Sequence, residues 1–311
     1  MIRYLSMWLR SRDVLPLLSL REPDFMRVCL DTYLRGEGGR NAENAPFPCI
    51  PALLRRRLTA LPITALRLGS EDCARCLPTV AEIELILNLC IHKGITLELV
   101  LPVISESMFP IIESIVAMVK VQPDMLLVVN DIGTLRYAMM QGVSRVALGR
   151  LMWKQKRLAR ISSQELQILD KNVLEEYKTL EVPTWSRDLG IAEYEFDLTP
   201  QGIAVDVDDG HLAFHLPWCV VAFGRTCFAG ALHQETSEKF KLGLPCRKEC
   251  DTFAEIFESP HWPGPLVRHG QFVLAQAGLC DFSWFDLRCA HKVVIDGTRA
   301  PLQDSASDLS M

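Results

Sequence analysis

Residues 63–101 read ITALRLGSEDCARCLPTVAEIELILNLCIHKGITLELVL, and this stretch decides the fold. It begins with the apolar run ITALRL (63–68) and ends with a second apolar run, ITLELVL (95–101). Both runs are short and rich in β-forming residues, which is typical of strands buried on both faces. The stretch therefore predicts two strands of a parallel sheet with a connection between them.

The connecting segment has the pattern of an amphipathic helix. Pro78 suits the first turn of a helix, and Gly94 is a good stop just past its end. The apolar residues that share one helical face are Val80, Ile83, Leu87 and Cys90. The whole stretch thus predicts a strand–helix–strand unit.

The same pattern continues along the chain. Two more apolar runs, MLLVV (125–129) and RVAL (145–148), follow after segments of helical character. Strands that recur every 20 to 30 residues or so, with helices between them, indicate βα units. We therefore predict an α/β fold, a TIM-barrel-like (β/α) arrangement of parallel strands.

After residue 180 the sequence changes to shorter β-like pieces. Residues 193–197 (EYEFD) and 204–214 resemble antiparallel strands, with a turn at Asp208, Asp209 and Gly210, in a β-rich, cysteine-containing C-terminal part. The 311 residues offer enough chain for one large barrel. The predicted domains are a divergent helical segment and linker (1–60), a barrel-like domain with a cysteine cluster at 219–250 (61–298), and a disordered tail (299–311).

Composition excludes several classes of protein. The chain is 49% hydrophobic and 23% charged, as in ordinary globular proteins. Its net charge of −5 argues against a wholesale nucleic-acid binder, although residues 132–163 hold seven basic residues and no acid. That run is either a solvated face or a contact for an anion or RNA. No window reaches the roughly 18 apolar residues of a membrane span, and no signal peptide is seen at the N-terminus, so we expect a cytoplasmic protein.

Polar side chains follow two of the predicted strands. Asn130 and Asp131 come directly after residues 125–129, and Arg150 and Lys154 follow 145–148. The carboxyl ends of parallel strands meet at one edge, where ligands bind in such folds, so these four residues are candidates for substrate binding. Asn130 and Asp131 are equally typical of a helix N-cap.

The eleven cysteines cannot all pair in internal disulfides, because their number is odd. In a reducing compartment, clustered cysteines indicate metal binding or catalysis. Thiolates select zinc or iron–sulfur clusters, and spacing alone does not decide between the two. The candidate ligands are two short pairs and three neighbours: Cys73 with Cys76, Cys246 with Cys250, and Cys219, Cys227 and Cys280. His211, His215 and Cys219 are a weaker zinc candidate, because Pro217 argues against the helix that the i, i+4 histidine spacing needs.

Five motifs together resemble peptidase family U-32, the collagenase-like family. They are LRLGSEDC (66–73), VVNDIGTLR (128–136), VALGRLMWKQKR (146–157), FGRTCF (223–228) and LPCRKEC (244–250). The likeness covers about residues 61–283 and is closest to the short iron–sulfur members, such as the smaller partner in anaerobic ubiquinone hydroxylation. Residues 1–60 depart from the family's usual first βα unit, and Cys76 is an extra cysteine.

The resemblance implies a barrel with a 4Fe-4S cluster on Cys73, Cys227, Cys246 and Cys250. Larger members use cysteines that match Cys280 and lie near Cys219, so these two are alternates, as is Cys76. The implied function is an iron–sulfur protein in oxygen-independent hydroxylation or a related redox modification. We expect a related U-32 protein as partner and a small molecule or RNA as substrate.

Two other functions stay open. The family's name implies a peptidase or other hydrolase, but the sequence contains neither HExxH nor GxSxG and indicates no catalytic residue. The cysteines also fit a zinc- or RNA-binding accessory module.

Overall fold

The structure of the protein is a computed structural model. It describes residues 4–10, 14, 56, 58–153, 155, 179–199, 203–206, 212–239, 241, 246–251, 253–260, 262, 264–276 and 292–296.

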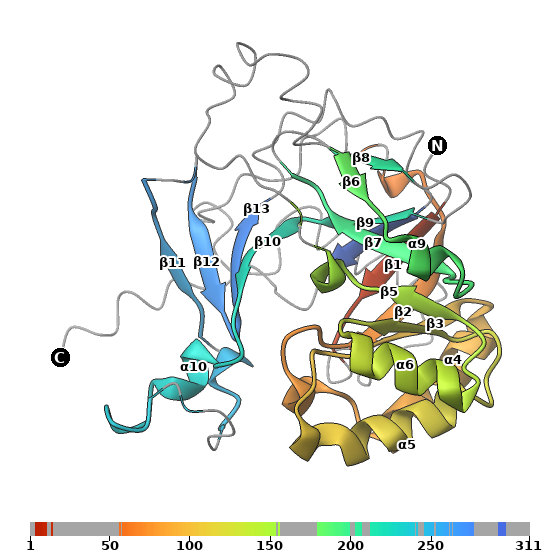
Figure 1. The fold of residues 1–311 in the computed structure, drawn as a ribbon, viewed down its shortest axis with the longest axis horizontal. Coiled ribbons are helices and arrows are strands. Elements are labelled where there is room, and N and C mark those ends of the chain that lie inside the picture. Colours follow the sequence, from red (N-terminus) through yellow and green to blue (C-terminus); the bar gives the residue numbers. More distant parts are fainter. Residues whose placement is uncertain are drawn as a thin grey trace, which may run out of the picture.

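Eight parallel strands form a closed barrel (Figure 1). Around the barrel they run in the order of the chain, so that each strand pairs with the next one and the last pairs with the first. The strands are β1 (Tyr4–Trp8), β2 (Ile63–Gly69), β3 (Thr96–Val100), β4 (Leu126–Val129), β5 (Val146–Leu148), β7 (Glu193–Asp197), β9 (Leu212–Leu216) and β14 (Lys292–Asp296). The TIM-barrel-like α/β fold predicted from the sequence is confirmed, and so are the strands at 63–68, 95–101, 125–129 and 145–148.

Helices α4 (Val80–Lys93), α5 (Phe109–Val119) and α6 (Ile132–Gln141) fill the three gaps between β2 and β5 and lie outside the barrel (Figure 1). Helix α4 begins with a capping box between Thr79 and Glu82 and ends at Gly94, whose φ of 65° is the left-handed conformation that favours glycine. The shorter helices are α9 (Thr184–Arg187) and α10 (Phe228–Ala231), with 3-10 turns at Ala74–Cys76, Glu106–Met108, Arg150–Met152 and Glu249–Asp251.

The barrel begins earlier in the chain than the sequence indicated. Strand β1 pairs in parallel with β14 on one side and β2 on the other. The prediction that residues 1–60 form only a helical segment and linker outside the barrel is therefore wrong for residues 4–8. The five residues of β1, YLSMW, are too few for a periodic pattern, and the strand is identified by its long-range pairing. Most of the predicted helical segment and linker (1–60) and the whole tail (299–311) lie outside the described residues.

The prediction of antiparallel strands at 193–197 and 204–214 is wrong. Strand β7 pairs in parallel with β9 and β5, and β8 (Ala204–Asp206) pairs in parallel with β6 (Thr179–Glu181). The polar positions of EYEFD point into the barrel, where Glu193 and Glu195 find cationic partners, rather than into solvent. An alternating pattern therefore arose from a charged interior and not from a solvated face.

An antiparallel sheet is inserted between β9 and β14. It consists of β10 (Trp218–Phe223), β13 (Phe272–Gln276), β12 (Leu266–His269) and β11 (Glu255–Phe257), in that order, and stands beside the barrel (Figure 1). The expected β-rich, cysteine-containing C-terminal part is thus present as an insertion before the last barrel strand. Its own small core consists of Trp218, Val220, Val267, Phe272 and Leu274.

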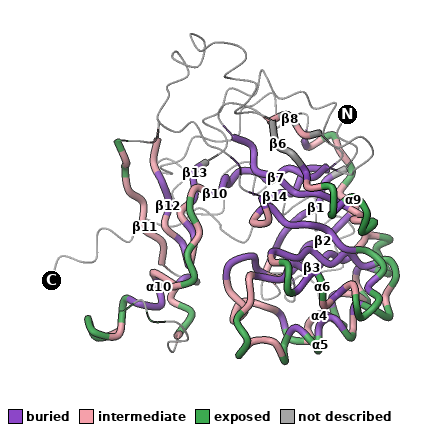
Figure 2. The backbone as a smooth tube through the Cα atoms, viewed as in Figure 1, coloured by how far each residue is buried: buried purple, intermediate pink, exposed green. Residues whose placement is uncertain are grey.

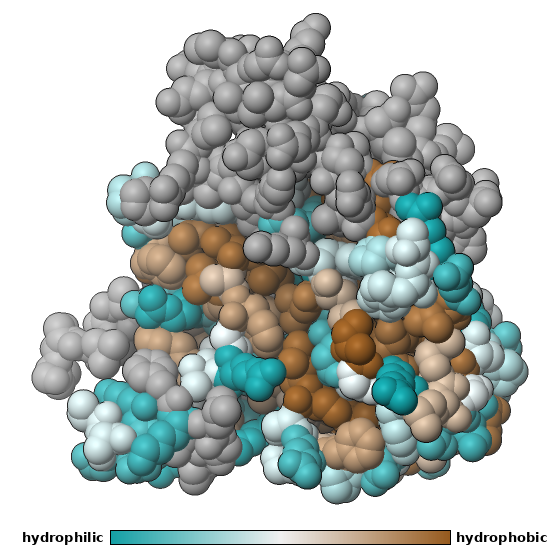
Figure 3. All heavy atoms as spheres, in the orientation of Figure 1, coloured by the Kyte–Doolittle hydropathy of each residue, from teal (hydrophilic) through white to brown (hydrophobic). Residues whose placement is uncertain are grey.

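Burial is concentrated in the barrel strands, and green exposed segments mark the outer helices (Figure 2). One large apolar cluster joins the outer faces of the strands to α4, α5 and α6. On the face shown in Figure 3, brown apolar residues gather in the centre and teal residues lie along the lower edge. Within the described part of the chain, we find no helix with the length and apolarity needed to cross a membrane.

Candidate functional site

The loop after β2 carries the first two cysteines of the candidate site. The chain leaves β2 through Gly69, whose φ is 106° and where a Cβ would lie 2.2 Å from the carbonyl oxygen of Val100. Only glycine fits that close approach. The Ser70 hydroxyl then donates to Asp72 at 2.6 Å and accepts the Cys73 N–H at 3.1 Å. These bonds fix Cys73 directly in front of the 3-10 turn that ends at Cys76.

The inserted segment carries three more thiols of the candidate site, and a hydrogen bond fixes each of these cysteines. Cys227 caps α10, and its sulfur accepts the Gly230 N–H at 3.3 Å. The sulfur of Cys246 accepts the Lys248 N–H at 3.2 Å, and Lys248 has a φ of 61°, uncommon for a residue with a side chain. The carbonyl of Cys250 lies 2.8 Å from His269 Nε2. Backbone N–H groups aimed at sulfur stabilise thiolates and tune metal clusters.

The fold brings these five thiols together. The Cys76 thiol lies close enough to both Cys73 and Cys250 for their side chains to shift its pKa, which places the loop after β2 beside the insertion. Cys227 lies close enough to Cys73 and Cys246 to interact with both electrostatically. A Cβ on Gly230 would lie 3.5 Å from the Cys227 sulfur and 3.9 Å from the Cys246 sulfur. Residues more than 150 positions apart in the sequence thus share one site.

A cavity of about 240 Å³ opens beside the thiols. Cys73, Cys227 and Cys246 line it, together with the segment from Val103 to Met108 that follows β3. Its charged lining residues are Arg75, Arg225, Lys241 and Asp72. The space next to the sulfurs is therefore larger than a single metal ion needs and carries an excess of positive charge.

The thiols shift one another's ionisation. The hydrogen bond with Cys76, followed by burial, raises the pKa of Cys73. The hydrogen bond with Cys250 and burial raise the pKa of Cys76 to about 12, although Cys73 lowers it in part. Burial raises the pKa of Cys227, and the nearby Cys73 and Cys246 add to the effect. Gathered thiols of this kind stay protonated at neutral pH unless a cation stabilises them as thiolates.

The sequence-based substrate residues have contacts inside the protein. Asn130 is buried, donates to the Leu101 carbonyl at 2.9 Å and accepts the Leu151 N–H. Asp131 caps α6 and accepts the Thr134 N–H and hydroxyl, both at 2.7 Å. The N-cap interpretation thus applies to Asp131, and Asn130 fixes the ends of neighbouring strands.

Arg150 is also an internal residue. Its guanidinium donates to Glu71 at 2.8 and 3.0 Å, to Asp197 at 2.8 Å and to the Trp218 carbonyl at 2.7 Å. Lys154 and Cys280 lie outside the described residues, and Cys219 lies in β10 opposite Ala275.

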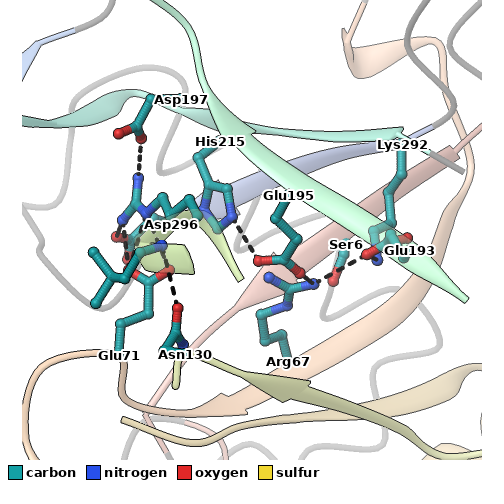
Figure 4. Close-up of polar contacts among 12 residues, drawn as sticks. Ser6, Arg67, Glu71, Asn130, Glu193, Glu195, Asp197, His215, Lys292 and Asp296 are labelled. Carbon is teal, nitrogen blue, oxygen red and sulfur yellow. Dashed lines mark hydrogen bonds and ion pairs between the residues drawn. The ribbon is translucent and has the colours of Figure 1, made fainter. Parts of the chain in front are cut away.

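The barrel interior holds a network of ion pairs between arginine or lysine and carboxylate side chains, which the sequence pattern did not indicate (Figure 4). Arg67 contacts Glu195 at 2.6 Å, Glu98 at 2.8 Å and Glu193 at 3.6 Å, and Lys292 contacts Glu193 and Glu98. Arg150 contacts three further carboxylates, of Glu71, Asp197 and Asp296. Charged residues in otherwise apolar strands, such as Arg67 in ITALRL and both Lys292 and Asp296 in KVVID, were the signal that could have indicated it.

Burial opposes the ionisation of the network's acids, and the neighbouring charges decide the outcome. For Glu195, Arg67 and the bond with His215 outweigh burial and hold its pKa well below the usual range. For Glu193, burial together with Glu98 and Glu195 outweighs the attraction of Lys292 and raises its pKa to about 7.

The chain matches no protein-family model, no curated protein and no solved structure.

Proposed function

We propose that the protein is an iron–sulfur protein of the U-32 type that takes part in oxygen-independent hydroxylation or a related redox modification. The observation that carries the proposal is the convergence of Cys73, Cys227 and Cys246, from two distant segments, on one cavity, with Cys250 linked to Cys73 through Cys76. Cys76 provides a fifth thiol at the same place. Cys73 and Cys76 follow a barrel strand at its carboxyl end, where such folds place their chemistry.

The space beside the thiols supports a four-iron cluster over a single zinc ion. Four or five thiols satisfy either centre, since both prefer sulfur ligands. A zinc ion fills the space between its four ligands, whereas a cluster needs a larger volume between the sulfurs and the protein. The absence of a Cβ at Gly230 leaves such room beside Cys227 and Cys246.

Each part of the site has a function in this proposal. Cys73, Cys227, Cys246 and Cys250 hold the cluster, and the Gly230 and Lys248 N–H groups stabilise two of the sulfurs. When bound, the cluster would supply electrons for the modification. Arg75, Arg225 and Lys241 offset the negative charge of the thiolates. We further propose a reducing cytoplasm, which the free thiols of the described cysteines support, with a related U-32 protein as partner and a small molecule or RNA as substrate.

Anaerobic purification tests the cluster. We expect a brown protein with about four iron and four sulfide per chain, as a four-iron centre requires. Simultaneous replacement of Cys227, Cys246 and Cys250 by Ser should abolish iron binding. A colourless protein without stoichiometric iron and sulfide, or iron that survives the triple replacement, contradicts the proposal. One zinc ion per chain in place of iron would identify the accessory-module alternative.

Single cysteine variants identify the fourth ligand. If Cys73 ligates the cluster, Cys73→Ser should lower the iron content and shift the cluster's EPR signal after reduction, while Cys280→Ser and Cys76→Ser leave both unchanged. The reverse pattern would assign the ligand to Cys280 or Cys76.

The hydrolase alternative predicts that the cluster-free protein cleaves a peptide library in air. Turnover that depends on the reduced cluster, with no cleavage by the cluster-free protein, supports the redox function instead.

A further inference from the structure

We propose that Glu71, Glu195 and His215 form a binding site for a divalent transition-metal ion inside the barrel. A ring nitrogen of His215 and one carboxylate oxygen from each glutamate lie within 4.8 Å of one another. All three side chains are fully buried. They come from three separate parts of the barrel, namely the end of β2, strand β7 and strand β9 (Figure 4).

The imidazole of His215 is in a position to coordinate a metal ion. Its Nε2 lies 2.9 Å from Glu195 Oε2. Its Nδ1 is buried and has no hydrogen-bond partner among the described residues. Because Glu195 faces Nε2, an ion ligated by both residues would coordinate Nε2 in place of this contact, and Nδ1 would keep the ring proton.

The network around His215 contains more acidic than basic side chains. Two clusters meet at His215: Arg67 and Lys292 face Glu98, Glu193 and Glu195, and Arg150 faces Glu71, Asp197 and Asp296. Among the described residues, this network therefore has six carboxylates and three permanent cations. Buried excess charge is costly unless it is compensated. Glu195 belongs to the first cluster and Glu71 to the second, so an ion bound to both would lie where the two negative groups meet.

The arginines prepare the carboxylates for such an ion. Arg150 donates to both oxygens of Glu71, and Arg67 contacts Glu195 at 2.6 Å. Each carboxylate has about four acceptor positions, so one arginine does not use them all. Hydrogen-bonded partners of this kind orient the ligands around metals in proteins.

The donor set selects the class of metal. Two carboxylates and one imidazole suit Mn²⁺, Fe²⁺ or Zn²⁺, whereas Ca²⁺ and Mg²⁺ prefer oxygen alone. Thiolates select softer metals, so the thiol cluster and the trio of Glu71, Glu195 and His215 prefer different metal ions. Mn²⁺ therefore probes the trio specifically and does so whether or not the thiols hold a cluster.

The test is Mn²⁺ binding by the full-length protein, produced in manganese-supplemented medium and purified without chelators. We expect about one tightly bound Mn²⁺ per chain. Its pulsed EPR spectrum should show coupling to a histidine nitrogen, and ¹⁵N-histidine labelling should change that coupling. His215→Gln and Glu71→Gln should each weaken Mn²⁺ binding by at least about 100-fold, because loss of a supporting residue alone costs about 10- to 100-fold.

Two variants serve as controls. Glu193→Gln replaces another buried carboxyl group of the network without touching the trio, and His233→Gln removes the histidine that pairs with Glu249 near the thiol cluster. Both should retain Mn²⁺. Absence of tight binding, bound Mn²⁺ without histidine coupling, or binding that persists in folded His215→Gln overturns the proposal. Should His215→Gln fail to fold, the nitrogen coupling of the unmodified protein decides the question.

Discussion

Arg150 lies where a substrate-binding residue is expected, but its side chain is buried and contacts other groups of the protein. It follows a barrel strand at the expected edge, in the GRLMWKQKR segment, yet its side chain is almost completely buried. Its guanidinium donates hydrogen bonds to Glu71, Asp197 and the Trp218 carbonyl. It therefore joins the barrel interior to the first strand of the inserted sheet.

Replacement of Arg150 should destabilise the fold strongly. Arg150→Met leaves buried carboxylates without their cation and should lower the free energy of unfolding by about 3–5 kcal/mol. Arg145→Met is the matched control, because Arg145 is exposed and donates to the Asp124 carbonyl on the surface, and should change stability by less than about 1 kcal/mol. Urea denaturation measures both. Equal effects for the two variants would be inconsistent with a structural role for Arg150.

Gly230 provides a single-residue test of the space beside the thiols. A Cβ at this position makes ordinary contacts with the Cys227 and Cys246 sulfurs, so Gly230→Ala should fold. The added methyl group should nevertheless exclude a cluster and lower the iron and sulfide per chain to less than about half, since it fills space between the ligands. Gly224→Ala, where nothing lies closer than 4.0 Å, should retain full iron. Full iron in Gly230→Ala would show that the cluster does not occupy this space.

Among the elements, the β12–β13 turn connects the inserted sheet to the loop after β2. Gly270 in this turn has a φ of 60°, and a Cβ there would lie 2.6 Å from Asp72 Oδ2. Its carbonyl also accepts the Phe228 N–H, next to Cys227. One turn thus contacts both segments that carry the thiols.

Gly270→Ala should therefore affect the site as well as stability. Alanine in the left-handed region costs about 1 kcal/mol, and displacement of Asp72 should disturb the Ser70 hydroxyl that fixes Cys73. We expect a lower iron content together with a larger loss of stability than in the control Gly94→Ala. Gly94 has a φ of 65° with open space around it, so only the backbone cost applies. Identical iron content and stability in the two variants would exclude this coupling.

The sequence predicts some helices and strands better than others. The segment from Ile63 to Leu148 was predictable because its strands are continuous apolar runs and its helices have clear caps. EYEFD was assigned the wrong pairing because a buried carboxylate looks like an exposed one in a sequence. Only the positions of Arg67 and Lys292 in space show that its glutamates are paired internally.

For the whole molecule, closure depends on the first strand. Strand β1 bridges β14 and β2, and Leu5, Met7 and Trp8 are buried in it. Without this strand the barrel has two open edges.

A charge in β1 should therefore prevent folding. Met7 is fully buried in the large apolar cluster, so Met7→Asp should cost more than about 4 kcal/mol and abolish the cooperative thermal transition. Met140→Asp, at a position that is 74% exposed, should leave the transition within a few degrees of the unmodified protein. Circular dichroism measures both. A cooperative transition in Met7→Asp would place β1 outside the folding unit.

The sequence predicted the barrel class and four of its strands, but not its closure. Closure is a contact between residues 4–8 and 292–296, which no local pattern contains. The grouping of Cys73, Cys227, Cys246 and Cys250 was suggested by short spacings and family-like motifs. The fold shows how they meet, since the insertion leaves the barrel after β9 and returns beside the loop after β2.

The pairing of the first strand with the last also orders events during synthesis. A ribosome makes Tyr4–Trp8 long before Lys292–Asp296, so the nascent chain holds an unclosed sheet until β14 has emerged. During that interval Arg67, Glu98 and Glu193 lack the lysine that completes their network. The newly made chain is consequently most exposed to aggregation and proteolysis just before its last strand appears.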